Sequence, residues 1–324
     1  MSPAGGLREL LRPPPHRGPL IAAGAVCLGV GIALEEVRLA DRLADPVHML
    51  ILLAIGALIF WLGAQAPNEG GVPPAYQSIL LVTGAFLLYA GLVTAGNVLG
   101  ANLNEFPPTG TLLWTSLVLG GLLLWPAFER NSAISLLLAA ILGGVAVLSW
   151  WDFVFRVSSP APYRWLLAAY SAFLVLSGLA LREPARRHAE VLIDAGGLAT
   201  AAIAVTSFDF FALQGTPLPG IWEVVLLGAG FGLVAFGAVD RSPGPAYLGV
   251  VNLGLFILVV ADSGDETLFW WPIVLLMVGG AMLLAGLRPR RPLPPEPDPY
   301  RAGEAPLAAR ADDEELVIRV RKDD

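Results

Sequence analysis

Charged residues are scarce in this chain of 324 residues, because Asp, Glu, Lys and Arg together make up only 15% of it. A typical soluble domain has about 25%. Apolar residues make up 56% of the chain. Since lipid rather than water must cover so much apolar surface, the composition excludes an ordinary soluble protein. A formal net charge of −7, carried partly by the end of the chain, gives no support for nucleic-acid binding.

Cysteine, lysine and histidine are also rare. Cys27 is the single cysteine, which excludes an intrachain disulfide and a cysteine-based metal site. Lys322 is the single lysine, and His16, His48 and His188 are scattered. The chain has no His-Glu-x-x-His zinc helix, no phosphate-binding Gly-x-x-x-x-Gly-Lys loop and no Gly-x-Ser-x-Gly nucleophile elbow. We therefore expect no cofactor, and enzymatic activity is uncertain and disfavoured.

What the chain does have is a succession of apolar stretches, each about as long as a bilayer is thick. Roughly 20 apolar residues at about 1.5 Å rise cover a hydrocarbon core of roughly 30 Å. The sequence thus predicts an all-α, polytopic transmembrane bundle of about ten spans. We place them near residues 19–36, 47–64, 78–100, 110–127, 133–151, 164–181, 191–212, 222–239, 246–261 and 270–287.

The first apolar stretch has two interpretations. Arg8, Arg12 and Arg17 precede it, as basic residues precede the apolar part of a signal peptide. The small-residue run 23–25, however, lies too early in the stretch to be a cleavage site. We favour an uncleaved first helix.

Arginines near the ends of the spans predict the orientation, because basic residues are enriched on the cytoplasmic side. With a cytoplasmic N-terminus, the inner segments hold eleven arginines and the outer segments four. This bias predicts an even number of spans, both termini in the cytoplasm and a bacterial inner membrane as the location. The inner set is Arg8, Arg12, Arg17, Arg130, Arg182, Arg186, Arg187, Arg241, Arg288, Arg290 and Arg291, and the outer set is Arg38, Arg42, Arg156 and Arg164.

Tryptophans agree with these boundaries, since indole rings prefer the headgroup layer. A role for the Trp150–Trp151 pair in stacking on a substrate is the alternative to simple anchoring. Trp114, Trp150, Trp151, Trp165, Trp222, Trp270 and Trp271 fall at predicted outer ends, and Trp61 and Trp125 at inner ends.

Strongly polar side chains within the spans are the candidates for an intramembrane site, because they are costly there. Asn252 is the deepest, in the middle of the ninth span. Together with Asn97 and Asp209 it forms a possible polar site, whose convergence on a central cavity would favour transport. An apolar bundle would favour a structural role. Asp194 lies about one turn inside the seventh span, near the inner boundary.

An acidic loop follows the ninth span, where Asp262, Asp265 and Glu266 place three carboxylates within five residues. Carboxylates of this kind bind Ca²⁺ or Mg²⁺, but the spacing differs from that of a calcium loop. We favour a solvated loop and expect no metal site. Carboxylates converging around Asp152, Asp209 and Asp262 would instead favour an enzyme or a metal site.

A basic inner loop, Arg182-Glu-Pro-Ala-Arg-Arg-His188, lies between the sixth and seventh spans. Its charge predicts contact with anionic lipid headgroups.

The end of the chain differs in composition. Residues 289–299 hold six prolines and predict an extended linker, and residues 300–313 are polar and predicted to be disordered. Residues 314–321 alternate, with Leu316, Ile318 and Val320 on one face of a short strand. Such a strand either stays disordered or adds to the sheet edge of a protein partner.

One segment carries a family resemblance. Asn252-Leu-Gly-Leu-Phe256 is followed by a short acidic loop, by Phe269-Trp-Trp-Pro272, by Gly279-Gly280 and by Arg288-Pro-Arg-Arg291. This final hairpin resembles the end of uncharacterised multi-spanning membrane proteins of bacteria, notably actinobacteria. The resemblance implies a helical membrane bundle and no known activity.

The sequence therefore predicts three parts: a cytoplasmic segment at 1–18, a transmembrane bundle at 19–287 and a largely disordered cytoplasmic tail at 288–324. Its predicted partners are the lipid bilayer and, where the strand adds to a sheet, a protein that binds residues 314–321; no nucleic-acid partner is expected. The favoured function is that of a structural or accessory envelope membrane protein. The alternatives are a small-solute or lipid transporter and, third, a membrane enzyme acting on a lipid-linked substrate.

Overall fold

The computed structural model describes residues 17–39, 42–67, 73–101, 108–156, 159–208, 218, 220–262, 273 and 277, with the side chains of residues 36, 37 and 262 left out. Every regular element in these ranges is an α-helix. The helices are α2 (Gly18–Leu39), α3 (Asp45–Ala64), α4 (Ala75–Val98), α5 (Thr109–Glu129), α6 (Ala133–Phe155), α7 (Ala161–Ala180), α8 (Arg186–Val205), α9 (Gly220–Asp240) and α10 (Pro243–Asp262).

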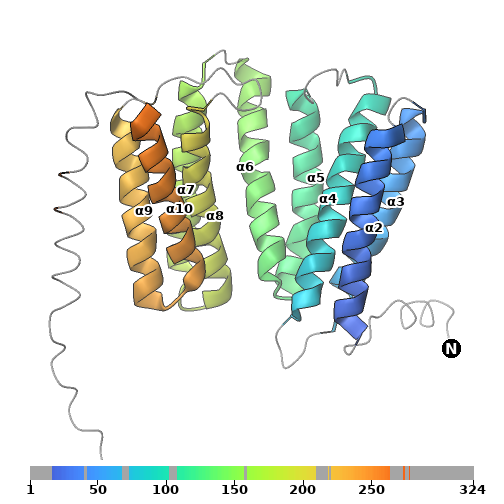
Figure 1. Ribbon diagram of the computed structural model, residues 1–324, viewed down its shortest axis with the longest axis horizontal. Helices are drawn as coiled ribbons and strands as arrows, with labels where there is room; N and C mark the ends of the chain where they lie inside the picture. The colour runs from blue at the N-terminus through green and yellow to red at the C-terminus, as the bar shows by residue number, and fades with distance from the viewer. Residues whose placement is uncertain are drawn as a thin grey trace, which may run out of the picture. The chain divides into compact units, whose positions relative to one another are not determined.

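All nine helices of the described ranges are long and apolar enough to cross a membrane (Figure 1). They correspond to the first nine predicted spans, so the prediction of a polytopic helical membrane bundle is confirmed. The predicted tenth span, 270–287, the tail at 288–324 and most of the N-terminal segment 1–18 lie outside the described residues.

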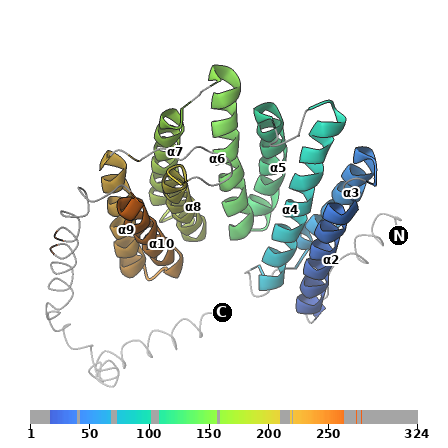
Figure 2. The same cartoon turned by 45° about the horizontal axis from the view of Figure 1, so that its top comes forward.

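The helices pack mainly as pairs of sequence neighbours: α3 with α4, α5 with α6, α7 with α8, and α9 with α10 (Figures 1 and 2). α2 packs on α4. The pairs are joined by contacts of α4 with α5, of α6 with α8 and of α8 with α10. α8 therefore contacts helices from three different pairs, and it is the most deeply buried of the spans.

Contacts between helix ends show that successive helices run in opposite directions. Asn97 near the end of α4 bonds to Asp45 at the start of α3, and Asp152 near the end of α6 bonds to Tyr163 at the start of α7. We call the end at which α2, α4, α6, α8 and α10 finish the predicted outer end, after the orientation that the arginines predict. The opposite end is the predicted inner end.

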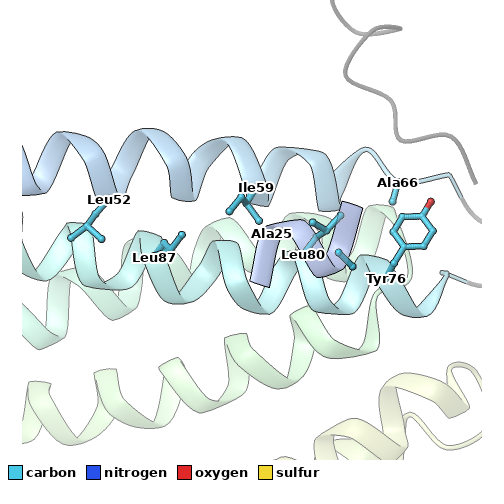
Figure 3. Close-up of a cluster of buried hydrophobic side chains, with 8 residues drawn as sticks. Ala25, Leu52, Ile59, Ala66, Tyr76, Leu80 and Leu87 are labelled. Atoms are coloured by element: carbon cyan, nitrogen blue, oxygen red, sulfur yellow. The ribbon is translucent and has the colours of Figure 1, made fainter. Parts of the chain in front are cut away.

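The α3–α4 pair shows how closely these helices pack. A Cβ atom on Gly84 would lie 2.5 Å from the backbone nitrogen of Phe60, and one on Gly56 would lie 2.8 Å from that of Leu88. Small residues allow such backbone approach in membranes, where dispersion rather than the hydrophobic effect holds helices together. The approach brings together a cluster of buried side chains, drawn in Figure 3: Ala25 of α2, Leu52 and Ile59 of α3, and Tyr76, Leu80 and Leu87 of α4, with Ala66.

One boundary differs clearly from the prediction. The seventh span was expected at 191–212, whereas α8 begins at Arg186 and ends at Val205. Apolar content alone marks the start of a span too late here, because a helix continues through a polar first turn at the interface, where long side chains extend toward water. The shift places Asp194 at the ninth residue of α8.

Candidate functional site

Asn252 lies at the centre of the interface between α8 and α10. It is the tenth residue of α10 and is fully buried, with 0% of its surface exposed. Its amide Nδ2 donates to the backbone oxygen of Gly197 in α8 at 3.2 Å and to that of Leu248 in its own helix at 2.9 Å. The amide oxygen has no hydrogen-bond partner among the described residues. Asn252 thus joins two helices in mid-span.

The adjacent carbonyl of α8 receives a side chain from α7. Ser171 Oγ lies 2.8 Å from the backbone oxygen of Gly196 and 2.8 Å from Thr200 Oγ1, which itself donates to Gly196 at 3.1 Å. The two successive glycines of α8 therefore accept bonds from neighbours on different sides, Gly196 from α7 and Gly197 from α10.

A small cavity of about 260 Å³ borders this cluster. Ser171, Gly196 and Thr200 contribute to its lining from α7 and α8, and Gly232 and Phe236 contribute from α9. Ser171, Gly196 and Gly232 lie near the middle of their helices, and Phe236 lies closer to the predicted inner end, so the cavity extends from mid-span toward that end. Its hydroxyl groups are already bonded to each other and to the backbone, which leaves little polar capacity for a solute.

Asn97 occupies a different place from Asn252. It is the next-to-last residue of α4, and its amide donates to the carboxylate of Asp45, the first residue of α3. The structure thus holds Asn97 at a helix end in the α3–α4 pair and Asn252 at mid-helix in the α8–α10 interface, and does not bring the two together. Asp209, the third member of the predicted polar site, lies outside the described residues.

Asp194 packs against the first turn of α10. A Cβ atom on Gly244 would lie 2.5 Å from one carboxylate oxygen of Asp194, so a larger residue here would require the carboxylate to move. The other oxygen, Oδ1, has no hydrogen-bond partner among the residues that the structure describes. A carboxylate beside a helix N-terminus is favourably placed, because the helix dipole is positive there.

Two groups of charged side chains hold the helix ends of the α7–α10 region. At the predicted inner end, Arg182 pairs with Asp240, and Arg186 donates to the backbone oxygen of Asp240 at 2.7 Å. At the predicted outer end, Arg164 is 3% exposed and donates to Thr206 Oγ1 at 2.9 Å. Arg182 and Arg186 of the basic loop thus bind protein groups, and their side chains stay 48% and 63% exposed, so the expected contact of this loop with lipid headgroups stays a prediction. Sequence reasoning missed Asp240, which follows an apolar span and gives no separate signal.

An open cleft of about 760 Å³ lies at the predicted outer end. The end of α4, the start of α5 and the end of α6 form it. Its lining includes Leu99, Thr109, Trp114, Asp152, Phe153 and Arg156. Ligand sites commonly measure about 300–1,000 Å³. Asp152, Arg156 and Trp114 were placed at predicted outer ends from the sequence, but nothing in the sequence predicts that they share a cleft.

The predicted acidic cluster cannot be placed from these ranges. Asp265 and Glu266 lie outside the described residues, and Asp262 ends α10 with its side chain left out. Among the residues that are described, no group of three or more His, Cys, Asp or Glu side chains is arranged to hold a metal ion.

Comparisons with protein-family models, with curated proteins and with solved structures found no match to this chain.

Proposed function

We propose that this chain is an accessory envelope membrane protein, whose helices serve as a scaffold rather than as a pathway or an active site. One observation carries the proposal: polar side chains in mid-span bond to backbone carbonyls of neighbouring helices. Asn252 donates to Gly197, Ser171 bonds to Gly196, and Tyr170 of α7 donates to the backbone oxygen of Ala140 in α6 at 2.6 Å. Such bonds stabilise helix packing in membranes by about 0.6–2 kcal/mol each.

The proposal includes the location and the partner. Eleven arginines at one set of helix ends against four at the other support a bacterial inner membrane with both termini in the cytoplasm. The alternating segment 314–321 supports a cytoplasmic protein partner that accepts an added strand. The resemblance of the last hairpin to bacterial membrane proteins of unknown function agrees with this proposal but names no activity.

The test compares the assembly state of three tagged full-length proteins in native membranes. The wild type, Ile318→Asp and the control Val317→Asp are solubilised in mild detergent and separated by native electrophoresis. Ile318 belongs to the apolar face of the predicted strand, and Val317 to the other face. We expect a complex larger than the single chain for the wild type and for Val317→Asp, and its loss for Ile318→Asp.

A single chain in all three samples contradicts the accessory function. So does selective solute flux through the purified protein in liposomes, which would support the second candidate, a small-solute or lipid transporter. The cavity beside Ser171 and Thr200 is the observation that favours that candidate.

A further inference from the structure

The cleft at the end of α6 lies at the depth of lipid headgroups. α6 has 23 residues, which span about 34 Å and so exceed a hydrocarbon core of about 30 Å. Asp152 lies in its last turn, and Arg156 follows its last residue. Trp150 and Phe153 of the same turn are exposed, as are the side chains of an interfacial aromatic belt. The cleft therefore opens where headgroups, rather than acyl chains or bulk water, surround the protein.

Two charged residues at the end of α6, Asp152 and Arg156, line the cleft. The backbone N–H of Arg156 donates to the backbone oxygen of Asp152 at 2.8 Å, which keeps the residues one helical turn apart. Arg156 has a φ of 46°, a left-handed backbone conformation that glycine usually adopts at a helix end. An arginine at this position places a guanidinium at the rim of the cleft.

The charges do not neutralise each other. No ion pair of Arg156 occurs within the described ranges, so its guanidinium is available to an external anion. The carboxylate of Asp152 accepts a hydrogen bond from the hydroxyl of Tyr163, which orients it. A carboxylate has two oxygens with several lone pairs, so it can accept further hydrogen bonds from an ammonium group.

Apart from Thr109 and Thr111, the rest of the cleft lining is glycine or is apolar or aromatic. Leu99 and Phe153 expose large apolar side chains, and Trp114 is half-buried beside them. A charged pair next to an apolar surface matches an amphiphile rather than a water-soluble ion. An anionic headgroup would meet repulsion from Asp152, whereas a headgroup with both signs of charge matches both residues.

We propose that this cleft binds a phospholipid whose headgroup carries a phosphate and a primary ammonium, that is, a phosphoethanolamine headgroup. Arg156 binds the phosphate through its planar N–H donors. Asp152 accepts hydrogen bonds from the ammonium, which a quaternary choline cannot donate. The acyl chains lie against Leu99 and Phe153. This site is independent of the accessory function, because it is formed by α4, α5 and α6 and involves neither the tail nor a protein partner.

The test measures lipid binding by the purified full-length protein in detergent. Apparent affinities are compared for phosphatidylethanolamine, phosphatidylcholine and phosphatidylglycerol of the same acyl chains, and for free phosphoethanolamine, by thermal stabilisation and by native mass spectrometry. We expect phosphatidylethanolamine to bind at least tenfold more tightly than the other three. Arg156→Gln and Asp152→Asn each lower its affinity by about tenfold, as loss of a charge-assisted hydrogen bond predicts.

Two further variants keep the test decisive. Arg156→Lys retains the charge but loses the planar donors, and its affinity should lie between those of the wild type and Arg156→Gln. Arg38→Gln removes an arginine at the same end of α2, where it pairs with Glu35 outside the cleft, and should bind as the wild type does. Equal affinity for the three lipids, an unchanged affinity of folded Arg156→Gln, or free phosphoethanolamine that binds as tightly as the lipid would each overturn the proposal. Since binding is measured without partners, these results do not depend on the native-membrane assembly experiment.

Discussion

Replacing Gly84 by alanine should separate α3 from α4, the pair that buries the cluster of Figure 3. The added Cβ would lie 2.5 Å from the backbone nitrogen and 2.7 Å from the Cα of Phe60, where ordinary contact begins at 3.4 Å. The shortfall is therefore 3.4 minus 2.5, or about 0.9 Å. Because the obstacle is the main chain of α3 and not a flexible side chain, a rotamer change cannot relieve it.

The size of the effect follows from packing. If the helices move apart by about 0.5–1 Å, each dispersion contact across the gap loses a quarter to a half of its energy. The side chains that lose contacts in this way are those of Leu52, Ile59, Leu80 and Leu87. Overpacking of this kind costs about 1–3 kcal/mol. A glycine-to-alanine substitution inside a helix stabilises the helix by about 1 kcal/mol through helix propensity alone. The cost of the clash is therefore the difference in stability between Gly84→Ala and another glycine-to-alanine variant that has no clash.

Gly121→Ala is the matched control, because Gly121 lies inside α5 and a Cβ there has no atom within 4 Å. We expect Gly84→Ala to be less stable than Gly121→Ala by about 1–3 kcal/mol. The assay is reversible unfolding of the purified protein in mixed micelles, followed by circular dichroism at increasing denaturing detergent. Equal stability of the two variants would refute the close backbone approach of α3 and α4.

Two other predictions concern the centre of the bundle and its orientation. Asn252→Ala removes the bond to Gly197 and should destabilise the protein by about 1 kcal/mol in the same unfolding assay; a variant as stable as the wild type would show that this bond contributes nothing. Reporter fusions after Pro184, between α7 and α8, and after Arg288 should both report a cytoplasmic location, and an external signal from either would contradict the predicted topology.

Local sequence determines the helices of this protein, because an unbroken apolar stretch in lipid has to satisfy its backbone hydrogen bonds internally. For the same reason the spans at 133–151 and 222–239 were predicted within a few residues of α6 and α9. The start of α8 was predicted too late, because a polar first turn, from Arg186, precedes the apolar part of this helix. Asn252 was recognised as the deepest polar side chain because its position within a span is a local property.

Which helices meet is not a local property, and only the tertiary structure decided it. Nothing near Asn252 in the sequence indicates that its partner is Gly197, 55 residues earlier. Asn97 lies equally well within an apolar stretch, yet it bonds to Asp45 at a helix end. The cleft likewise needs α4, α5 and α6 side by side before Trp114 and Arg156 share a surface. The sequence by itself determined the spans and their polar residues, and the packing of helices decided which of those residues meet.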